Sequence, residues 1–178
     1  MLRLFYPYEY ADSVFSIDFE ALKQKGYKAI LFDIDNTLVH HGDDSTEEID
    51  KLFDYLHGLG FQTLLLSNND QERIERFNKN IETLYICDAE KPNPKNYRKA
   101  LAMMKVEKEE AVVIGDQIFT DIYGANKSGI PSVLVHFIRL KEERNIGIRR
   151  HVEFIILSIW KKSKRYHNRM GKITKEVL

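Results

Sequence analysis

Residues 30–39, ILFDIDNTLV, give the strongest indication of the fold of this chain. Its beginning is continuously apolar, so residues 29–32 are predicted to form a strand buried on both faces of a parallel sheet. Asp33 then stands at the carboxyl end of that strand, where open α/β sheets place their ligands. A carboxylate at this position can hold a hard cation or attack an electrophile. Alternatively, Asp33, Asp35 and Asn36 form an Asx-type turn that only ends the strand, and this stretch alone does not decide between the two.

The length and composition are typical of one soluble globular domain. The chain has 178 residues, of which 43% are hydrophobic and 30% are charged. Its one cysteine, Cys87, cannot form an internal disulfide, which suits a reducing compartment. No signal peptide follows Met1, and the longest apolar run, residues 154–160, is far shorter than the roughly 20 residues of a membrane span. We therefore expect a cytoplasmic protein whose contact with a membrane, if any, is peripheral and on the inner face.

The charges of the chain are distributed unevenly. Residues 139–178, the basic tail, contain 12 Lys and Arg against 4 Asp and Glu. Residues 1–138 contain 15 Lys and Arg against 23 Asp and Glu. An acidic body with a basic tail favours a polyanionic partner, either a membrane surface or nucleic acid. A solvated helix followed by a frayed end is the alternative without a partner.

Short apolar runs and helical patterns alternate along the middle of the chain. Strands are predicted at residues 28–32, 62–66, 84–87, 111–114 and 132–136. Helices are predicted at residues 46–59, 70–80, 94–104 and about 119–128. Alternation at this spacing requires right-handed crossovers and a parallel sheet, which makes the fold class α/β.

We divide the chain into three parts. Residues 1–25 are rich in aromatic side chains and are expected to cover an edge or a face of the sheet. Residues 26–138 form the α/β core, and the basic tail follows. Residues 149–166 of the tail read as a basic helix, whose apolar side chains are spread too widely for one clean stripe. Packing against the body and lying in a membrane interface are therefore equally plausible for this helix.

Polar groups follow three further strands at the edge where Asp33 is expected. Ser67 and Asn68 follow the second strand, Lys91 follows the third, and Asp116 and Asp121 follow the fourth. Each has an ordinary structural explanation, such as a turn, a solvated lysine or a helix cap. Acid, hydroxyl, lysine and acid groups at four neighbouring strand ends are much harder to explain in that way. Together they favour a site for a phosphoryl group and a cation.

These residues resemble the four motifs of the haloacid dehalogenase (HAD) superfamily. The ordered set is Asp33-x-Asp35-x-Thr37, Ser67, Lys91 and Gly115-Asp116-x-x-x-x-Asp121. The longer segments FDIDNTLV, SNN, KPNP and IGDQIFTD narrow the resemblance to the YqeG family, phosphatases of HAD subclass IIIA. That resemblance spans residues 30 to about 135 and implies a three-layer, Rossmann-like fold with a five-stranded parallel sheet in the order 5-4-1-2-3. Related mitochondrial enzymes dephosphorylate phosphatidylglycerophosphate.

The resemblance assigns the two carboxylates of the first motif to different tasks. Asp33 is expected to attack phosphorus and become an aspartyl phosphate. Asp35, protonated at first, is expected to give its proton to the leaving oxygen and then to activate water. This second carboxylate favours a phosphatase over a dehalogenase, because a leaving halide needs no proton.

The remaining motif residues are expected to bind ions or to support those that do. Mg²⁺ would be held by Asp33, Asp116 and the main-chain carbonyl of Asp35. The other assignments are Ser67, Asn68 and Lys91 for phosphoryl oxygens, with Thr37 and Asp121 in support. Asp121 is expected to serve Lys91 or a metal-bound water rather than the ion itself.

The spacing of the motifs leaves no room for a cap domain. A loop and one helix fill the interval between Thr37 and Leu65, and one helix and a strand fill that between Ser67 and Lys91. An open site suits a large substrate, and we expect a phospholipid head group, phosphatidylglycerophosphate, at a membrane surface. The basic tail would add about 1 kcal/mol of attraction per Lys or Arg near an anionic leaflet.

Two alternatives remain. The first is a protein associated with nucleic acid or ribonucleoprotein that binds through the basic tail, although the tail lacks an aromatic pattern for stacking bases. The second is a HAD phosphatase for a soluble phosphomonoester.

Overall fold

The computed structural model describes residues 2–140 and 147–175. Within these residues, six strands form one parallel sheet in the order β1-β6-β5-β2-β3-β4. The strands are β1 (Glu9–Ala11), β2 (Ala29–Phe32), β3 (Gln62–Leu66), β4 (Leu84–Ile86), β5 (Ala111–Gly115) and β6 (Ser132–Val135). The last five lie in the predicted order, so the α/β parallel fold is confirmed. The predicted number of strands is one too few, because β1 has three residues and carries no readable pattern.

Six α-helices accompany the sheet in the described part of the chain. They are α1 (Phe19–Gln24), α2 (Glu47–Gly58), α3 (Gln71–Asn78), α4 (Pro94–Met104), α5 (Tyr123–Ser128) and α6 (Gly147–Lys162). Short helices are η1 (Leu2–Phe5), η2 (Val14–Ser16), η3 (Lys108–Glu110) and the π-helical turn η4 (Ile118–Ile122). The predicted helix at 119–128 is therefore a π turn followed by α5, and the predicted helix at 149–166 ends earlier, at Lys162.

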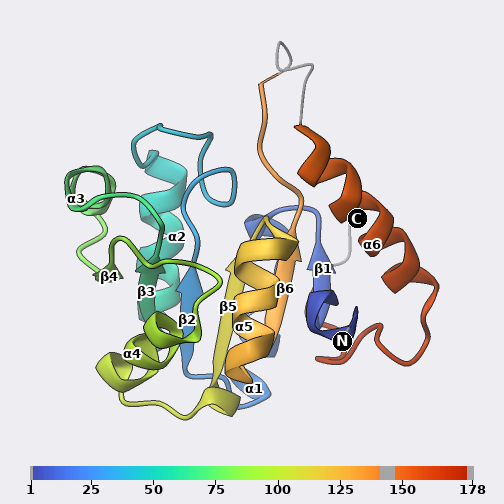
Figure 1. Cartoon of the computed structure of the whole chain (residues 1–178). Coiled ribbons are helices and arrows are strands. Elements are labelled where there is room, and N and C mark those ends of the chain that lie inside the picture. Colours follow the sequence, from blue (N-terminus) through green and yellow to red (C-terminus); the bar gives the residue numbers. More distant parts are fainter. Residues whose placement is uncertain (1, 141–146, 176–178) are drawn as a thin grey trace.

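Side chains that alternate along β2 divide the core into two layers. Ile30 and Phe32 belong to the apolar cluster that contains the buried residues of α1, α2 and α3. Ala29 and Leu31 belong to the cluster with α4 and α5 on the other face (Figure 1). All four side chains are fully buried, as expected for a central parallel strand covered by helices on both faces.

Capping residues explain where the helices near the sheet's carboxyl edge begin. The Thr46 hydroxyl accepts a hydrogen bond from the backbone amide of Ile49 at the start of α2. The Asp70 carboxylate accepts a hydrogen bond from the backbone amide of Arg73 at 2.9 Å and so caps the start of α3. Pro94 occupies the first turn of α4, where a missing amide hydrogen costs nothing. These caps begin the three helices that follow β2, β3 and β4 in the chain.

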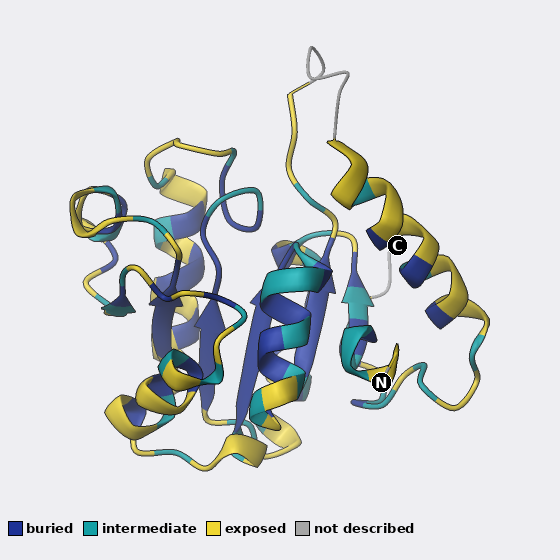
Figure 2. Cartoon of the chain, viewed as in Figure 1, coloured by how far each residue is buried: buried dark blue, intermediate teal, exposed yellow. Residues whose placement is uncertain are grey.

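The described N-terminal segment and the segment after α6 lie against each other. β1 pairs with β6 as an edge strand, and Glu9 aligns with Val133. Beyond α6 the chain returns to this segment, where the amide of Asp18 donates to the carbonyl of Ile173 at 2.7 Å. The described part of the basic tail is therefore packed against the body. Its outer surface along α6 is exposed, and a few buried positions point inward (Figure 2).

In residues 2–140 and 147–175, no helix has the length and apolar character required to cross a membrane.

Candidate active site

The predicted residues meet at the carboxyl edge of strands β2, β3, β4 and β5. The register aligns Phe32 of β2 with Leu65 of β3 on one side and with Ile114 of β5 on the other. Because these strands end level, the residues that follow them converge. They are Asp33 after β2, Ser67 after β3, Lys91 after β4 and Asp116 after β5, and all four are buried. Buried polar groups are costly unless they are paired, so their contacts carry information about the site.

Lys91 joins two of the acidic motifs. Its Nζ donates to Asp33 Oδ1 at 2.5 Å and to Asp121 Oδ1 at 2.7 Å. Burial alone would lower the pKa of Lys91, but the charges of Asp121 and Asp33 raise it above its usual value. The lysine is therefore a fixed positive charge beside Asp33. The backbone around it is also positioned, because the amide of Lys91 donates to Asn68 Oδ1 at 2.8 Å.

Thr37 lies between the carboxylates of the first and fourth motifs. Its hydroxyl is 3.1 Å from Asp33 Oδ2 and 3.2 Å from Asp116 Oδ1. Burial raises the pKa of Asp33 to about 6 and that of Asp116 to about 8, and the neighbouring carboxylates add to both shifts. This concentration of buried negative charge is the kind of environment that a cation relieves.

The carboxylates suit a divalent metal. Asp33, Asp116 and Asp121 are buried and each offers an oxygen within 4.8 Å of the others. Hard cations such as Mg²⁺ and Ca²⁺ prefer oxygen ligands of this type. Asp121 is the least available, because Oδ1 accepts from Lys91 and Oδ2 accepts from the amide of Gln117 at 3.0 Å. These contacts favour Asp33 and Asp116 as the metal ligands, with Asp121 in support of Lys91.

The π-helical turn η4 brings Asp121 back beneath the end of β5. A single π turn inside a helix is rare and is often found at functional sites. A Cβ on Gly115 would lie 2.5 Å from the Cβ of Asp121, so only glycine allows this approach. The hydroxyl of Tyr97 holds the turn from α4 by donating to the carbonyl of Thr120 at 3.1 Å.

Asp35 lies at the rim of the site and has several partners. It accepts hydrogen bonds from Asn69 Nδ2 at 2.8 Å, from Arg73 Nη2 at 3.1 Å and from the amide of Gly42 at 3.2 Å. His41 Nδ1 lies 3.1 Å from Asp35 Oδ2. Burial raises the pKa of Asp35, but the Asn69 and Gly42 hydrogen bonds and the charge of Arg73 outweigh it, and the net pKa lies below the usual value.

The ionised state of Asp35 differs from the expectation that this residue begins protonated. The physical reasons are the hydrogen bonds from Asn69 and the Gly42 amide together with the charge of Arg73, a residue that sequence reasoning missed. Its only signal was its place one turn after the Asp70 cap, on the helix that follows the SNN motif.

Arg150 is a second functional candidate that the sequence did not indicate. It comes from α6, yet its Nη1 donates to the main-chain carbonyl of Asp116 at 2.7 Å and its Nη2 to Asp116 Oδ2. The neighbouring Arg149 lines the same polar cavity as Asp33 and Lys91. No spacing rule relates α6 to the motifs, so only the folded chain reveals these contacts.

The cavity above these residues has a volume of about 240 Å³ and opens to solvent. Its lining includes Asp33, Asp35, Ser67, Asn68, Lys91 and Arg149. Thr37 contacts Asp33, Asp121 contacts Lys91, and Asp116 is joined to Asp33 through the Thr37 hydroxyl. The structure thus brings five of the predicted site residues to the lining of one cavity and links the other three to them by hydrogen bonds.

Comparison with known proteins identifies the chain's family. Residues 89–137 match the family model described as HAD-hydrolase-like. The chain is 33% identical over 161 residues to the protein named Probable phosphatase YqeG from Bacillus subtilis (strain 168), a match that covers 90% of this chain and 94% of that protein. The chain belongs to the YqeG family of HAD phosphatases. As an enzyme of this family it is a phosphoric monoester hydrolase, and phosphatases of this superfamily typically use a divalent metal.

Two further similarities are more limited. The Glyceraldehyde 3-phosphate phosphatase of Pyrococcus furiosus is 32% identical over 81 residues, which cover 44% of this chain and 33% of that protein. A crystal structure of an uncharacterized protein from Listeria monocytogenes serotype 4b superposes with a TM-score of 0.53 at 18% identity, covering 76% of this chain and 99% of that one. The structural likeness concerns the fold alone.

Proposed function

We propose that this YqeG-family phosphatase is magnesium-dependent, works through an aspartyl phosphate on Asp33 and acts on phosphatidylglycerophosphate at a membrane surface. The main support for this reaction is the set of contacts made by the Asp33 carboxylate. Its carboxylate contacts Lys91 on one side and Thr37 on the other, and it lines an open cavity beside Asp116. A nucleophile held in this way meets the main requirement of phosphoryl transfer, which is positioning.

The proposed reaction has two steps. An oxygen of Asp33 forms a bond to phosphorus while the bond from phosphorus to the substrate's alcohol oxygen breaks, and Asp35 gives that oxygen its proton. Asp35 then takes a proton from the water that attacks the aspartyl phosphate. Inorganic phosphate leaves, and Asp33 and the protonated Asp35 are restored.

Asp35 must gain a proton before the first step. In the structure its carboxylate is held by Arg73 and Asn69, and the exposed side chain of His41 touches it from the solvent side. We infer that an anionic substrate draws Arg73 away from Asp35, which removes the main positive charge that keeps it ionised. His41 provides a path by which the proton arrives.

The other residues bind the metal and the phosphoryl group, or hold the groups that do so in place. Asp33, Asp116 and the main-chain carbonyl of Asp35 would hold Mg²⁺, which when bound offsets the repulsion between the Asp33 carboxylate and the phosphate. Lys91 and Ser67 would bind phosphoryl oxygens, and Asn68 fixes the Lys91 backbone through its side-chain carbonyl. Thr37 and Asp121 hold Asp33 and Lys91 in place.

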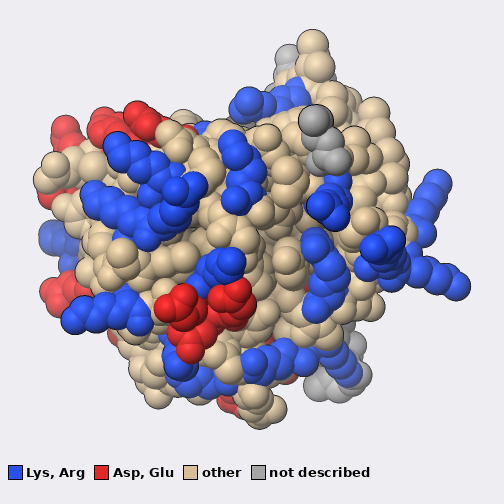
Figure 3. Space-filling view, turned by 60° about the horizontal axis from the view of Figure 1, so that its bottom comes forward, with Lys and Arg blue, Asp and Glu red and all other residues tan. Residues whose placement is uncertain are grey.

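The surface of α6 supports a lipid substrate. Four exposed apolar side chains recur at helical spacing: Ile148, Val152, Ile155 and Ile159, the α6 stripe. Ile148 is 85% exposed and Ile155 60%. Residues 147–175 contain nine Lys and Arg against one Glu, and Lys and Arg side chains project from the side of the molecule where α6 lies (Figure 3). An apolar stripe among cations matches an anionic lipid surface.

The stripe also lies close to the catalytic opening. Arg149, between Ile148 and Arg150, lines the cavity that contains Asp33. A lipid head group at the surface touched by α6 is therefore near the nucleophile, without a cap domain in the way.

A substrate panel tests this proposal. Phosphatidylglycerophosphate, glyceraldehyde 3-phosphate, nucleotides and sugar phosphates are assayed with Mg²⁺ and after EDTA treatment. We expect phosphate release from the lipid to dominate and to need the metal. If the enzyme releases no phosphate from the lipid but does hydrolyse glyceraldehyde 3-phosphate, a soluble substrate would be supported instead. The similarity to the Pyrococcus protein favours that alternative. Full activity after chelation would refute the metal dependence.

A vesicle assay tests the stripe separately. Ile155→Ser with Ile159→Ser is expected to abolish sedimentation with anionic phosphatidylglycerol vesicles while hydrolysis of a soluble aryl phosphate persists. Met103→Ser on α4 is the matched control, because Met103 is also an exposed apolar residue but lies on a different helix. Equal sedimentation of all three proteins would refute membrane docking through α6.

A further inference from the structure

We propose that Arg150 is a positioning residue for the metal-binding carboxylate of Asp116, and that through this contact the docking of α6 and the binding of the cation strengthen each other. This inference rests on the proposed metal-dependent reaction. It assigns a role to a residue 34 positions away in the sequence and outside every motif.

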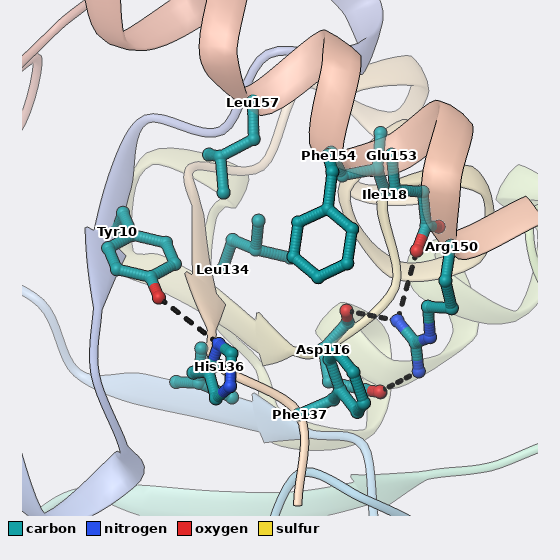
Figure 4. A pocket seen from close by; sticks show the side chains of 11 residues that line it. Tyr10, Asp116, Ile118, Leu134, His136, Phe137, Arg150, Glu153, Phe154 and Leu157 are labelled. Carbon is teal, nitrogen blue, oxygen red and sulfur yellow. Dashed lines mark hydrogen bonds and ion pairs between the residues drawn. The ribbon is translucent and has the colours of Figure 1, made fainter. Parts of the chain in front are cut away.

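The contact is a two-point clamp. Arg150 Nη1 donates to the main-chain carbonyl of Asp116 at 2.7 Å, and Nη2 donates to the Oδ2 atom of the same residue. The Asp116 side chain is fully buried and that of Arg150 is only 14% exposed. Figure 4 shows the planar guanidinium reaching both oxygens from α6. A planar group that holds the backbone and the side chain of one residue fixes the rotation of its carboxylate.

The clamp leaves the other oxygen of Asp116 for the cation. Oδ1 faces the Thr37 hydroxyl at 3.2 Å, and the same hydroxyl is 3.1 Å from Asp33 Oδ2. The two oxygens that point toward a shared ion are therefore distinct from the oxygen that Arg150 uses. Arg150 does not occupy the cation's position but orients a ligand toward it, as groups behind metal ligands commonly do.

Arg150 is itself held by α6 and by the chain after β6. Its Nη1 also donates to Glu153 Oε2 at 3.0 Å, and Glu153 Oε1 accepts the amide of Phe119 at 3.2 Å. The guanidinium lies 4.6 Å from the centre of the Phe137 ring. The cavity left beneath the helix is only about 30 Å³, so the clamp and its supports are closely packed (Figure 4).

The buried side chains of α6 connect this clamp to the docking of the whole helix. Ile156 and Trp160 pack in one cluster with Ile118 and Leu134. Undocking α6 would therefore withdraw Arg150 from Asp116. Because coupling between two equilibria is reciprocal, a cation that needs an oriented Asp116 must in turn stabilise the docked helix.

Titration with Mn²⁺ alone, followed by calorimetry, tests the positioning role without any turnover. We expect Arg150→Met to raise the dissociation constant about tenfold or more, since loss of groups behind metal ligands has effects of this size. Arg150→Lys keeps the charge but cannot donate to both oxygens of Asp116, and it too should bind more weakly than wild type. Lys161→Met is the control, because it removes a charge from α6 without contact with Asp116.

Hydrogen exchange of residues 147–162 tests the coupling. Mg²⁺ is expected to slow exchange in wild type and in Lys161→Met but not in Arg150→Met. Mn²⁺ binding by Arg150→Met as tight as in wild type, or tighter, would overturn the positioning role, and equal protection of its α6 by Mg²⁺ would overturn the coupling. Absence of Mn²⁺ binding to the wild-type protein would instead refute the proposed metal-dependent reaction and this inference with it.

Discussion

Lys91 Nζ and Asp33 Oδ1 lie 2.5 Å apart, although 58 residues separate them in the chain. The contact places a buried positive charge against the proposed nucleophile, on the side opposite Thr37. It arises because β2 and β4 lie in one parallel sheet with only β3 between them, so that both chain segments emerge at the same edge.

Replacing Lys91 by Met should destabilise the protein strongly. The substitution leaves Asp33 and Asp121 as buried carboxylates without their cation, and removing one partner of a buried pair costs about 3–5 kcal/mol. Urea denaturation in the absence of divalent metal measures the loss. Lys95→Met is the control, because Lys95 is exposed one turn away. A loss no larger than in the control would contradict the buried pairing.

Asp33→Asn and Asp35→Asn should separate the two proposed catalytic roles. The first should reduce turnover of every phosphomonoester to background, because the nucleophile is gone. The second should lower turnover about 10²–10⁴-fold for an alkyl phosphate and less for an aryl phosphate, whose leaving group needs less protonation. Steady-state assays on matched alkyl and aryl substrates measure this difference. Equal losses on both substrates would remove the proton-donor role of Asp35.

Arg73→Met should shift the pH profile of the enzyme. Arg73 lowers the pKa of Asp35, so its loss raises that pKa and keeps the proton donor protonated to higher pH. We expect the alkaline limb of the rate profile on an alkyl phosphate, whose leaving group needs the proton, to move upward in pH. Arg76→Met is the matched control, because Arg76 lies one turn later and pairs with Asp44 instead. If the alkaline limb of the rate profile keeps its position in Arg73→Met, Arg73 does not set the pKa of Asp35.

Without metal, stability should fall as the pH rises. The folded-state pKa is about 6 for Asp33 and about 8 for Asp116, both above the ordinary value of 3.8. The folded protein therefore holds these protons more tightly than the unfolded chain, so stability from these groups is greatest below about pH 4 and is lost as the pH rises through their folded pKa values. The lowered pKa of Asp35 acts only at the acidic end of this range.

Urea denaturation in EDTA between about pH 5 and pH 8 isolates this effect. Asp116→Asn should flatten the decline, because the group with the highest of these pKa values no longer titrates. Mg²⁺ should stabilise wild type more at the upper end, where the carboxylates are ionised. If the stability of Asp116→Asn declines with pH at the same slope as that of wild type, the decline is due to other groups.

Gly115→Ala should weaken the contact by which Asp121 holds Lys91. A Cβ at this position would lie 2.5 Å from Asp121 Cβ, so Asp121 must move away from Lys91 or the end of β5 must shift. We expect lower stability and a higher KM for phosphomonoesters. Gly58→Ala is the control, since nothing lies within 4 Å of the corresponding Cβ. Unchanged stability and KM in Gly115→Ala would show that the backbone adapts without cost.

Local patterns in the sequence predicted the central strands and the residues at their ends, and the family resemblance supplied the strand order. Apolar runs such as residues 62–66 are local and specify a buried strand directly, and β3 has the predicted bounds. Asp33, Ser67, Lys91 and Asp116 could be predicted because each follows such a run. In a parallel sheet, position along the chain then implies position in space.

The charges that face these residues follow from the packing of the folded chain. Arg150 reaches Asp116 from a helix that no motif includes, and Arg73 of α3 hydrogen-bonds Asp35 and helps to lower its pKa. β1 likewise joins the sheet through β6 rather than through a pattern of its own. The physical reason is common to all three. A long cationic side chain or a three-residue edge strand has no periodicity to read, and its partner is chosen by the packing of segments far apart in the chain.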